Sequence, residues 1–325
     1  MTPKEELVAY SRISVVVSAI AVRGPDWLSQ EGTQMKDFSP RNSKRELRLM
    51  EPKQISRGNM RQSKTAQLLL VALLCGCSFI THGSGTTKQD ILRAAQRSYY
   101  NLPNQGLIEF KCSAIPDWQA ILKRELKSDI SPDHPGLKLL SKIHFWLSLD
   151  EKGSAKLTHQ SDYAPTDEKS IANLNQTVSG MEEVLTGFSH TISPFLLTSP
   201  FPKTDGDYKL DEKQDGYQLS YRDGRFDVET TMRKDFAIVQ IKVASPEFKG
   251  TITPQLVKTD LGFLMTSYEG TYQPASGGAM RVSARIDYKA VEGLQLPSNL
   301  KINTANGDNV HSIEFQFSEY QLKKR

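Results

Sequence analysis

The side chains best suited to catalysis or metal binding are scattered along the chain. The six histidines, at positions 82, 134, 144, 159, 190 and 311, show no metal-ligand spacing. Asp133 precedes His134 and is the one acid beside a histidine, but the pair stands between prolines in a segment that is typical of a loop. Glu182 and Glu183 fall on the polar side of a helical pattern, where adjacent acids are usually solvated rather than an acid–base couple.

The sequence contains no nucleotide-binding loop, serine-hydrolase elbow or zinc-protease motif. His144 and His159 can face each other across a predicted hairpin, but two histidines on a solvated face usually have no further role. We therefore expect that the protein is not an enzyme and that it holds no metal and no cofactor.

Two of the three cysteines suggest a different chemistry, the covalent attachment of lipid. Residues 60–64 include two basic residues, residues 68–74 are apolar, and small residues follow. This order is typical of a secretory signal. The run Leu74-Cys75-Gly76-Cys77 resembles a bacterial lipobox, in which the last cysteine supplies the thiol that receives the lipid. We therefore expect lipid on Cys77, although alanine or serine is commoner at the position of Cys75.

Two alternatives to lipidation remain open. One is ordinary cleavage near Gly83 or Gly85, and the other is an uncleaved membrane anchor over residues 65–80. That stretch is just shorter than the roughly 17 to 25 residues that a membrane-spanning helix needs.

The position of the signal predicts how the chain is organised. Because a signal peptide starts at an initiator methionine, we expect translation to begin at Met60 and residues 1–59 to be a disordered, over-extended reading frame. Residues 60–77 are then the signal peptide and lipobox, residues 78–88 are a tether rich in Gly, Ser and Thr, and residues 89–325 are one folded domain.

The charge distribution excludes nucleic acid as a partner. The formal net charge is +4, but residues 84–325 hold 29 basic and 30 acidic residues, so the excess lies before the folded domain. A neutral domain without a basic face does not fit nucleic-acid binding. Cys112 is the only cysteine of that domain, and it ends an alternating run. We predict a half-buried strand residue there rather than a reactive thiol.

Hydrophobic periodicity predicts an α+β domain. We expect a helix that begins at about residue 89 and ends before Pro103, and further helices from Pro116 onward, over residues 167–192, and over residues 193–197 with Ser193 as the N-cap. Residues 132–136 are predicted to be a loop. Alternating residues predict a first strand near residues 107–112, a hairpin of residues 143–149 with 155–158, and roughly eight or more strands after residue 208.

These strands predict one antiparallel meander with an apolar and a polar face. The expected fold is a strongly curved antiparallel β-sheet, a half-barrel, covered by inserted helices.

This arrangement resembles the bacterial lipoprotein carrier and receptor (LolA/LolB-like) family. Ser193-Pro194-Phe195-Leu196-Leu197 looks like the proline-led apolar helix of those carriers, and Val291-Glu292-Gly293-Leu294-Gln295-Leu296-Pro297 looks like a late turn of related domains. The resemblance spans most of residues 88–322, to which the helix that contains Trp118 is an addition. It implies a half-barrel with a helical lid around an apolar cavity.

The expected lining of that cavity combines alternate sheet residues with apolar residues of the lid. These are Phe145, Leu147, Val239, Ile241, Ile286, Tyr288, Phe315 and Phe317 from the sheet, and Phe188, Phe195 and Leu196 from the lid. Strand alternation is the same in a lined cavity and in a filled core, so ordinary core packing is the alternative for each of them.

The resemblance and the predicted signal together imply a cell-envelope lipoprotein, monomeric and held to a membrane by its N-terminal lipid or anchor. We expect its body to lie in the periplasm or outside the cell and to bind an acyl chain or a lipidated protein, with lipoprotein sorting or lipid transfer as the role. A structural or interaction protein with a packed core is the first alternative. A secreted hydrolase is the second.

Lipidation at Cys77 predicts a specific response to inhibition of the lipoprotein signal peptidase. The uncleaved precursor is expected to accumulate, because the cysteine can be lipidated but the signal can no longer be removed. The mass of the protein from treated and untreated cells measures this, and an unchanged mass would contradict lipidation.

Overall fold

The computed structural model describes residues 87–162, 168–275, 278–307 and 309–325. The predicted extension of residues 1–59, the signal with Cys77, and the tether up to residue 86 lie outside the described residues.

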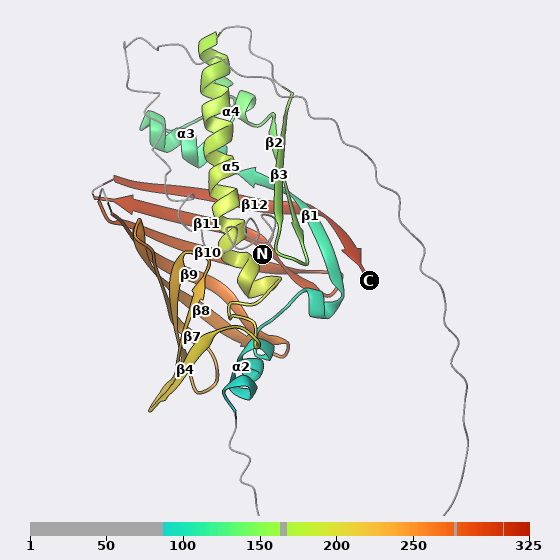
Figure 1. Cartoon of the computed structure of the whole chain (residues 1–325). Coiled ribbons are helices and arrows are strands. Elements are labelled where there is room, and N and C mark those ends of the chain that lie inside the picture. The colour runs from blue at the N-terminus through green and yellow to red at the C-terminus, as the bar shows by residue number, and fades with distance from the viewer. Residues whose placement is uncertain (1–86, 163–167, 276–277, 308) are drawn as a thin grey trace, which may run out of the picture. The chain divides into compact units, whose positions relative to one another are not determined.

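One sheet of twelve antiparallel strands makes up most of the described chain (Figure 1). In chain order the strands are β1 (Leu107–Pro116), β2 (Ile143–Asp150), β3 (Ala155–Ser161), β4 (Tyr208–Lys213), β5 (Gly216–Asp223), β6 (Phe226–Arg233), β7 (Ile238–Ala244), β8 (Phe248–Thr259), β9 (Gly262–Pro274), β10 (Met280–Val291), β11 (Leu294–Asn306) and β12 (Asn309–Lys324). The predicted meander is confirmed, as is the hairpin of β2 and β3.

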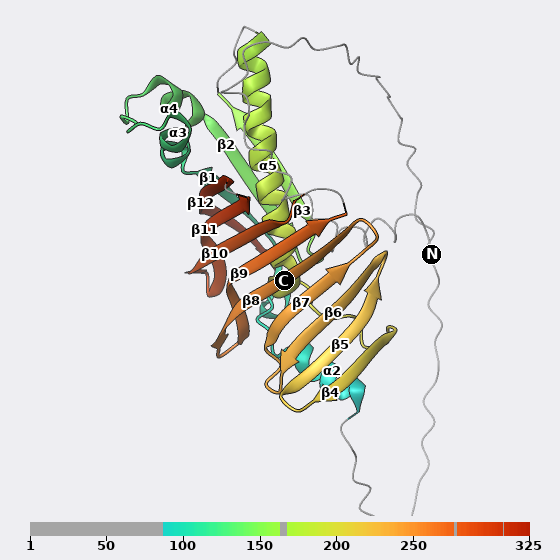
Figure 2. The ribbon, with the colours of Figure 1, turned by 90° about the vertical axis from the view of Figure 1, so that its left-hand side faces the viewer.

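The order of the strands is β3-β2-β1-β12-β11-β10-β9-β8-β7-β6-β5-β4. Neighbours in the sheet are therefore neighbours in the sequence, with one exception, the pairing of β1 with β12. This pairing joins the first and last strands, so that the free edges are β3 and β4 in mid-sequence and the sheet is not closed (Figure 2).

Short helices precede and interrupt the strands. α2 (Lys88–Arg97) begins one residue inside the predicted tether, where Thr87 and Asp90 form a capping box. A 3₁₀ turn, η2 (Pro103–Gln105), leads into β1. α3 (Trp118–Leu126) and α4 (Pro135–Leu140) lie between β1 and β2.

Two predictions about these helices are wrong. Pro116 is the last residue of β1 rather than the start of a helix, because the side chain of Asp117 accepts a hydrogen bond from the Ala120 amide and so caps α3. The predicted loop at residues 132–136 contains the start of α4. His134 is its N-cap, and Pro135 stands in the first turn, where its missing N–H costs nothing.

The longest helix, α5 (Glu168–Leu196), connects β3 to β4. The prediction of a separate helix at residues 193–197 is wrong, because α5 continues through Pro194. Ser193 does not cap a new helix. Its hydroxyl donates to the carbonyl of Ser189, one turn earlier in the same helix.

One face of the sheet is buried and the other is largely exposed. Along β2 and β6 buried residues alternate with exposed or half-buried ones, as a sheet with a single covered face requires. The buried face, α5 and α2 share one hydrophobic core. A smaller cluster of Phe226, Val228, Val243 and Phe248 lies within β6 to β8.

The sheet divides locally between β11 and β12. Their ladder stops at the pair Asn299 and Gln316. Beyond it, residues 294–297 of β11 pair with β10, whereas residues 317–324 of β12 pair with β1. We call this place, between residues 294–298 and residues 317–324, the β11–β12 split. Irregularities of register on both sides accompany it, including Glu319 at a positive φ of 52°.

The segment after α2 is held against the start of β9 by backbone hydrogen bonds. The Tyr100 amide donates to the Phe263 carbonyl at 2.9 Å, and the Phe263 amide donates to the Ser98 carbonyl at 2.7 Å. Gly262 makes this approach possible. Its φ is +116°, and a Cβ atom there would lie 2.7 Å from the carbonyl carbon of Tyr99.

Replacing Gly262 with alanine is expected to destabilise the protein by about 1–3 kcal/mol more than replacing Gly293. Gly293 is the matched control, because its φ is also positive, at +85°, but a Cβ atom there meets nothing within 4 Å. Urea denaturation of the two full-length variants measures the difference. Equal free energies of unfolding would show that the contact with Tyr99 is not tight.

Candidate functional site

The candidate site is the interface between α5 and the apolar face of the sheet. α5 contacts β3 and β9, and the ring of Phe188 stacks on Phe317 of β12 with centroids 5.8 Å apart and planes 20° apart. Figures 1 and 2 both show the helix lying against one side of the sheet. Val178, Met181, Leu185, Phe188 and Ile192 form its buried stripe, whereas Ile171, near the start of the helix, is 40% exposed.

A small void remains at this interface. Its volume is about 10 Å³, enough for about one water molecule. The lining residues come from β1, β2, α5 and the residue after it, β11 and β12: Phe110, Cys112, Leu147, Leu149, Phe188, Ile192, Leu196, Leu197, Pro297 and Phe317. The void is thus enclosed by apolar side chains of the helix on one side and of the sheet on the other. We call this interface the slot.

Four of the predicted lining residues meet in the slot: Leu147, Phe188, Leu196 and Phe317. Four others are buried elsewhere in the core: Phe145, Phe195, Ile286 and Phe315. Phe145 packs against Trp118 with ring centroids 6.4 Å apart, and Phe195 against Tyr99 at 6.2 Å. The prediction therefore identified residues on the covered face of the sheet, but it did not identify which of them line the slot.

Ile241 and Tyr288 are only half-buried and pack against the edge of the core. The Tyr288 hydroxyl donates to the carbonyl of Met265 at 2.6 Å, and burial raises the pKa of this phenol well above its ordinary value. Tyr288 thus stays protonated and serves as a bridge between β10 and β9.

The prediction for Val239 is wrong. This side chain is 44% exposed, because the register of β6 and β7 shifts at this position: Thr231 pairs with Gln240, but Met232 pairs with Ile238. The extra residue reverses the alternation, so that Ile238 rather than Val239 enters the core.

Six residues of the slot were not predicted: Phe110, Cys112, Leu149, Ile192, Leu197 and Pro297. Alternation placed Phe110, Cys112 and Leu149 on strand faces, and helical spacing placed Ile192 on the stripe of α5. The sequence analysis did not predict the pairing of β1 with β12, because no local pattern in the sequence indicates it. This pairing brings Cys112 close to Phe317.

Cys112 is the one residue of the slot with a titratable side chain. It is 1% exposed, and burial raises the pKa of its thiol to about 12. The thiol is therefore protonated at neutral pH and behaves as a small apolar group.

The C-terminal end of α5 and its middle are held differently. At the C-terminal end, the Leu102 amide donates to the Leu196 carbonyl at 2.8 Å, and Asn101 Nδ2 donates to the Thr198 carbonyl at 3.0 Å. Further toward the N-terminal end, His159 Nδ1 of β3 lies 2.8 Å from Glu182 Oε1, a contact that is substantially exposed. An exposed pair of this kind contributes little to stability. The helix is therefore anchored firmly at one end.

The hydroxyls on the C-terminal half of α5 mostly bond within the helix. Ser189 donates to the Leu185 carbonyl at 2.7 Å, and Thr191 to the Gly187 carbonyl at 3.0 Å. His190 differs, because its buried Nδ1 has no hydrogen-bond partner among the described residues, and burial lowers the pKa of its imidazole. Beside the side-chain hydrogen bond between Thr191 and Tyr268 of β9, this half of the helix is held mainly by its apolar contacts with the sheet.

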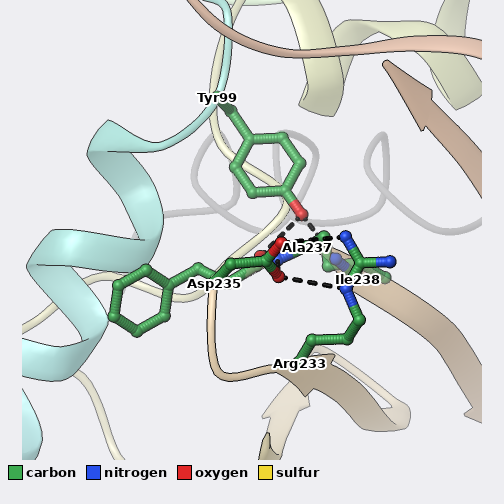
Figure 3. Close-up of polar contacts among 6 residues, drawn as sticks. Tyr99, Arg233, Asp235, Ala237 and Ile238 are labelled. Atoms are coloured by element: carbon green, nitrogen blue, oxygen red, sulfur yellow. Dashed lines mark hydrogen bonds and ion pairs between the residues drawn. The ribbon is translucent and has the colours of Figure 1, made fainter. Parts of the chain in front are cut away.

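A polar cluster at the end of α2 has a structural role (Figure 3). The Tyr99 hydroxyl donates to the Phe236 carbonyl at 3.0 Å and accepts from the Ile238 amide at 2.8 Å. In the same β6–β7 turn, Arg233 forms a two-point ion pair with Asp235, and its guanidinium lowers the pKa of that carboxyl. Since the Tyr99 hydroxyl bonds two backbone groups of the turn, the cluster anchors the turn to the segment that follows α2.

Among the described residues, no group of three or more His, Cys, Asp or Glu side chains is placed to hold a metal ion. None of the helices in these parts of the chain is long and apolar enough to cross a membrane. Comparisons with protein-family models, with curated proteins and with solved structures found no match to this chain.

Acidification is expected to destabilise the protein through His190. In the unfolded chain this imidazole takes up a proton near its ordinary pKa of about 6.5, whereas in the folded protein its pKa is lower. Below about pH 6.5 the unfolded state therefore binds more protons, and the free energy of unfolding falls as the pH falls.

Urea denaturation at pH 7.5 and pH 5.5 tests this expectation. The loss of stability on acidification is expected to be smaller in His190→Gln than in the unsubstituted protein. His144→Gln is the control for the other histidines, because His144 is exposed on β2. An equal loss in all three proteins would show that His190 is not responsible.

Proposed function

We propose that this protein is a non-catalytic, membrane-anchored carrier or receptor that binds an acyl chain between α5 and the sheet. The observation that carries the proposal is the slot. It is lined by apolar side chains from both α5 and the sheet, and it already contains a void.

Binding in the slot requires α5 to move, since the void has room for about one water molecule. The anchoring of α5 supports such a movement. Backbone hydrogen bonds fix the helix near Leu196, whereas the contact of Glu182 with His159 is exposed and weak. The helix can therefore pivot about its C-terminal end, so that Leu196 stays in place while Phe188, two turns before it, moves away from the sheet and admits the chain from that side of the slot.

The energy of acyl burial favours this movement. Each methylene group removed from water contributes about 0.8 kcal/mol, so that roughly ten methylenes contribute about 8 kcal/mol. This opposes the cost of separating α5 from the sheet, because the chain takes the place of the helix against Phe317 and Leu147.

In this proposal the open sheet is a strongly curved half-barrel and α5 is its lid, as the likeness to the lipoprotein carriers implies. The two free edges at β3 and β4, and the single buried face, support that description. Lipidation of Cys77, and a location in the cell envelope with the folded domain in water, belong to the same proposal. An acyl chain or a lipidated protein is then the ligand.

A second candidate function is that of an envelope interaction protein with a packed core. Near-complete burial of Phe145, Phe315 and Phe317, together with the small size of the void, favours it. In that case α5 is a fixed part of the core.

Native mass spectrometry of the full-length protein, together with extraction of its lipids, distinguishes the two functions. The carrier is expected to retain a stoichiometric lipid or to take up added dodecanoate. A protein that is isolated without lipid and refuses dodecanoate is the packed interaction protein.

Substitutions of Cys112 test whether the chain lies in the slot. Cys112→Ala enlarges the slot and is expected to maintain or raise the affinity for dodecanoate, whereas Cys112→Leu fills it and is expected to weaken binding about tenfold, the equivalent of about 1.4 kcal/mol. Calorimetric titration measures both affinities, and urea denaturation confirms that each variant is folded. Equal affinities in folded Ala and Leu variants would place the ligand elsewhere.

A further inference from the structure

The slot has a second side, formed by the β11–β12 split. Pro297 lies on the β11 side of the split and Phe317 on the β12 side, and both residues line the void. The β11–β12 ladder does not extend into the split, so side chains rather than ladder hydrogen bonds connect the two strands at this place.

Two side chains cross the split next to the void. The Tyr320 hydroxyl of β12 donates to the Pro297 carbonyl. From β10, Lys289 Nζ donates to the Phe317 carbonyl at 3.3 Å and lies 4.7 Å from the centre of the Tyr320 ring. The ammonium group therefore contacts the backbone of one void-lining residue and the side chain that binds another.

A third observation places Lys289 beside the slot. Burial raises the pKa of the Cys112 thiol, and the positive charge of Lys289 acts in the opposite direction and lowers it. Cys112 lines the void. The ammonium is thus close enough to the slot for its charge to be felt inside.

Lys289 has no carboxylate partner among the described residues. Two acids border the split. Glu292 pairs with Lys324 at 3.0 Å, and Glu319 forms no ion pair with Lys289. Lys289 is also exposed. Its charge is therefore available to a ligand, in contrast to Lys234, Lys242 and Lys324, each of which has an acidic partner.

We propose that Lys289 binds the anionic head group of an acyl ligand whose chain lies in the slot. This inference rests on the proposed function and names its substrate class, which is an amphiphile with one negatively charged head. A carboxylate or a phosphate can occupy the position, because either accepts a hydrogen bond from an ammonium group. The head group replaces the Phe317 carbonyl as the partner of Lys289, and the cation stays over the Tyr320 ring.

Calorimetric titrations of the full-length protein with dodecanoate, dodecyl phosphate and dodecanol test this inference. The three share one chain and differ in head group. The unsubstituted protein is expected to bind at least one anion about tenfold or more tightly than dodecanol, as a charge-assisted hydrogen bond predicts. The anion with the greater advantage identifies the source of the head group.

Lys289→Met is expected to abolish that advantage and to leave the affinity for dodecanol unchanged, because methionine keeps most of the apolar stem. Lys289→Arg is expected to retain the advantage. Lys301→Met is the matched control, since Lys301 is an exposed lysine of β11 that does not line the slot. Urea denaturation confirms that the Met variants are folded.

The outcomes separate this inference from the function on which it rests. If dodecanol binds as tightly as both anions, or if Lys289→Met keeps the preference for the anion, the slot binds acyl chains but Lys289 is not the head-group site. If none of the three compounds binds, the proposed function fails and the inference fails with it.

Discussion

The structure depends on one constraint, that an open twelve-stranded sheet with a single apolar face needs a cover. No second sheet is present in the described residues to supply it. α5 and α2 do so instead, and they share the main hydrophobic core with the strands. Burial of this face is the main source of stability. The same burial makes the interface the place where an apolar ligand can compete with the protein's own side chains. The stability of the fold and the capacity for binding therefore come from the same surface.

The sequence predicted the elements well wherever a local pattern determined them. Alternation located the hairpin of β2 and β3 and the long meander, and helical spacing located the body of α5. The errors lie where a tertiary contact overrides a local signal. Pro194 and Ser193 are typical of a helix start, yet α5 continues through them, since its end is bonded to Leu102. Val239 continues an alternation that a bulge in fact interrupts.

The candidate site was predicted in part for the same reason. Phe188 and Phe317 could be expected to meet, because the stripe of a helix must cover the apolar face of a sheet. Cys112 and Pro297 could not, since their positions in the slot depend on the pairing of β1 with β12 and on the place where β11 and β12 separate. Lys289 also escaped prediction. The alternating sequence of β10 predicts that Lys289 is an ordinary solvated lysine. Its position beside the void depends on the split, across which it bonds to Phe317.

The pairing of β1 with β12 has a consequence for how the protein folds. The sheet cannot be completed until the last strand has been synthesised, because β1 has only β2 as a partner before then. Contacts between strands so distant in sequence form slowly, since a long loop must close first. During that interval the apolar side of β1 and the edge of β11 are exposed, and both favour aggregation. A chain of this topology is therefore most prone to aggregate in the interval before its last strand pairs with β1.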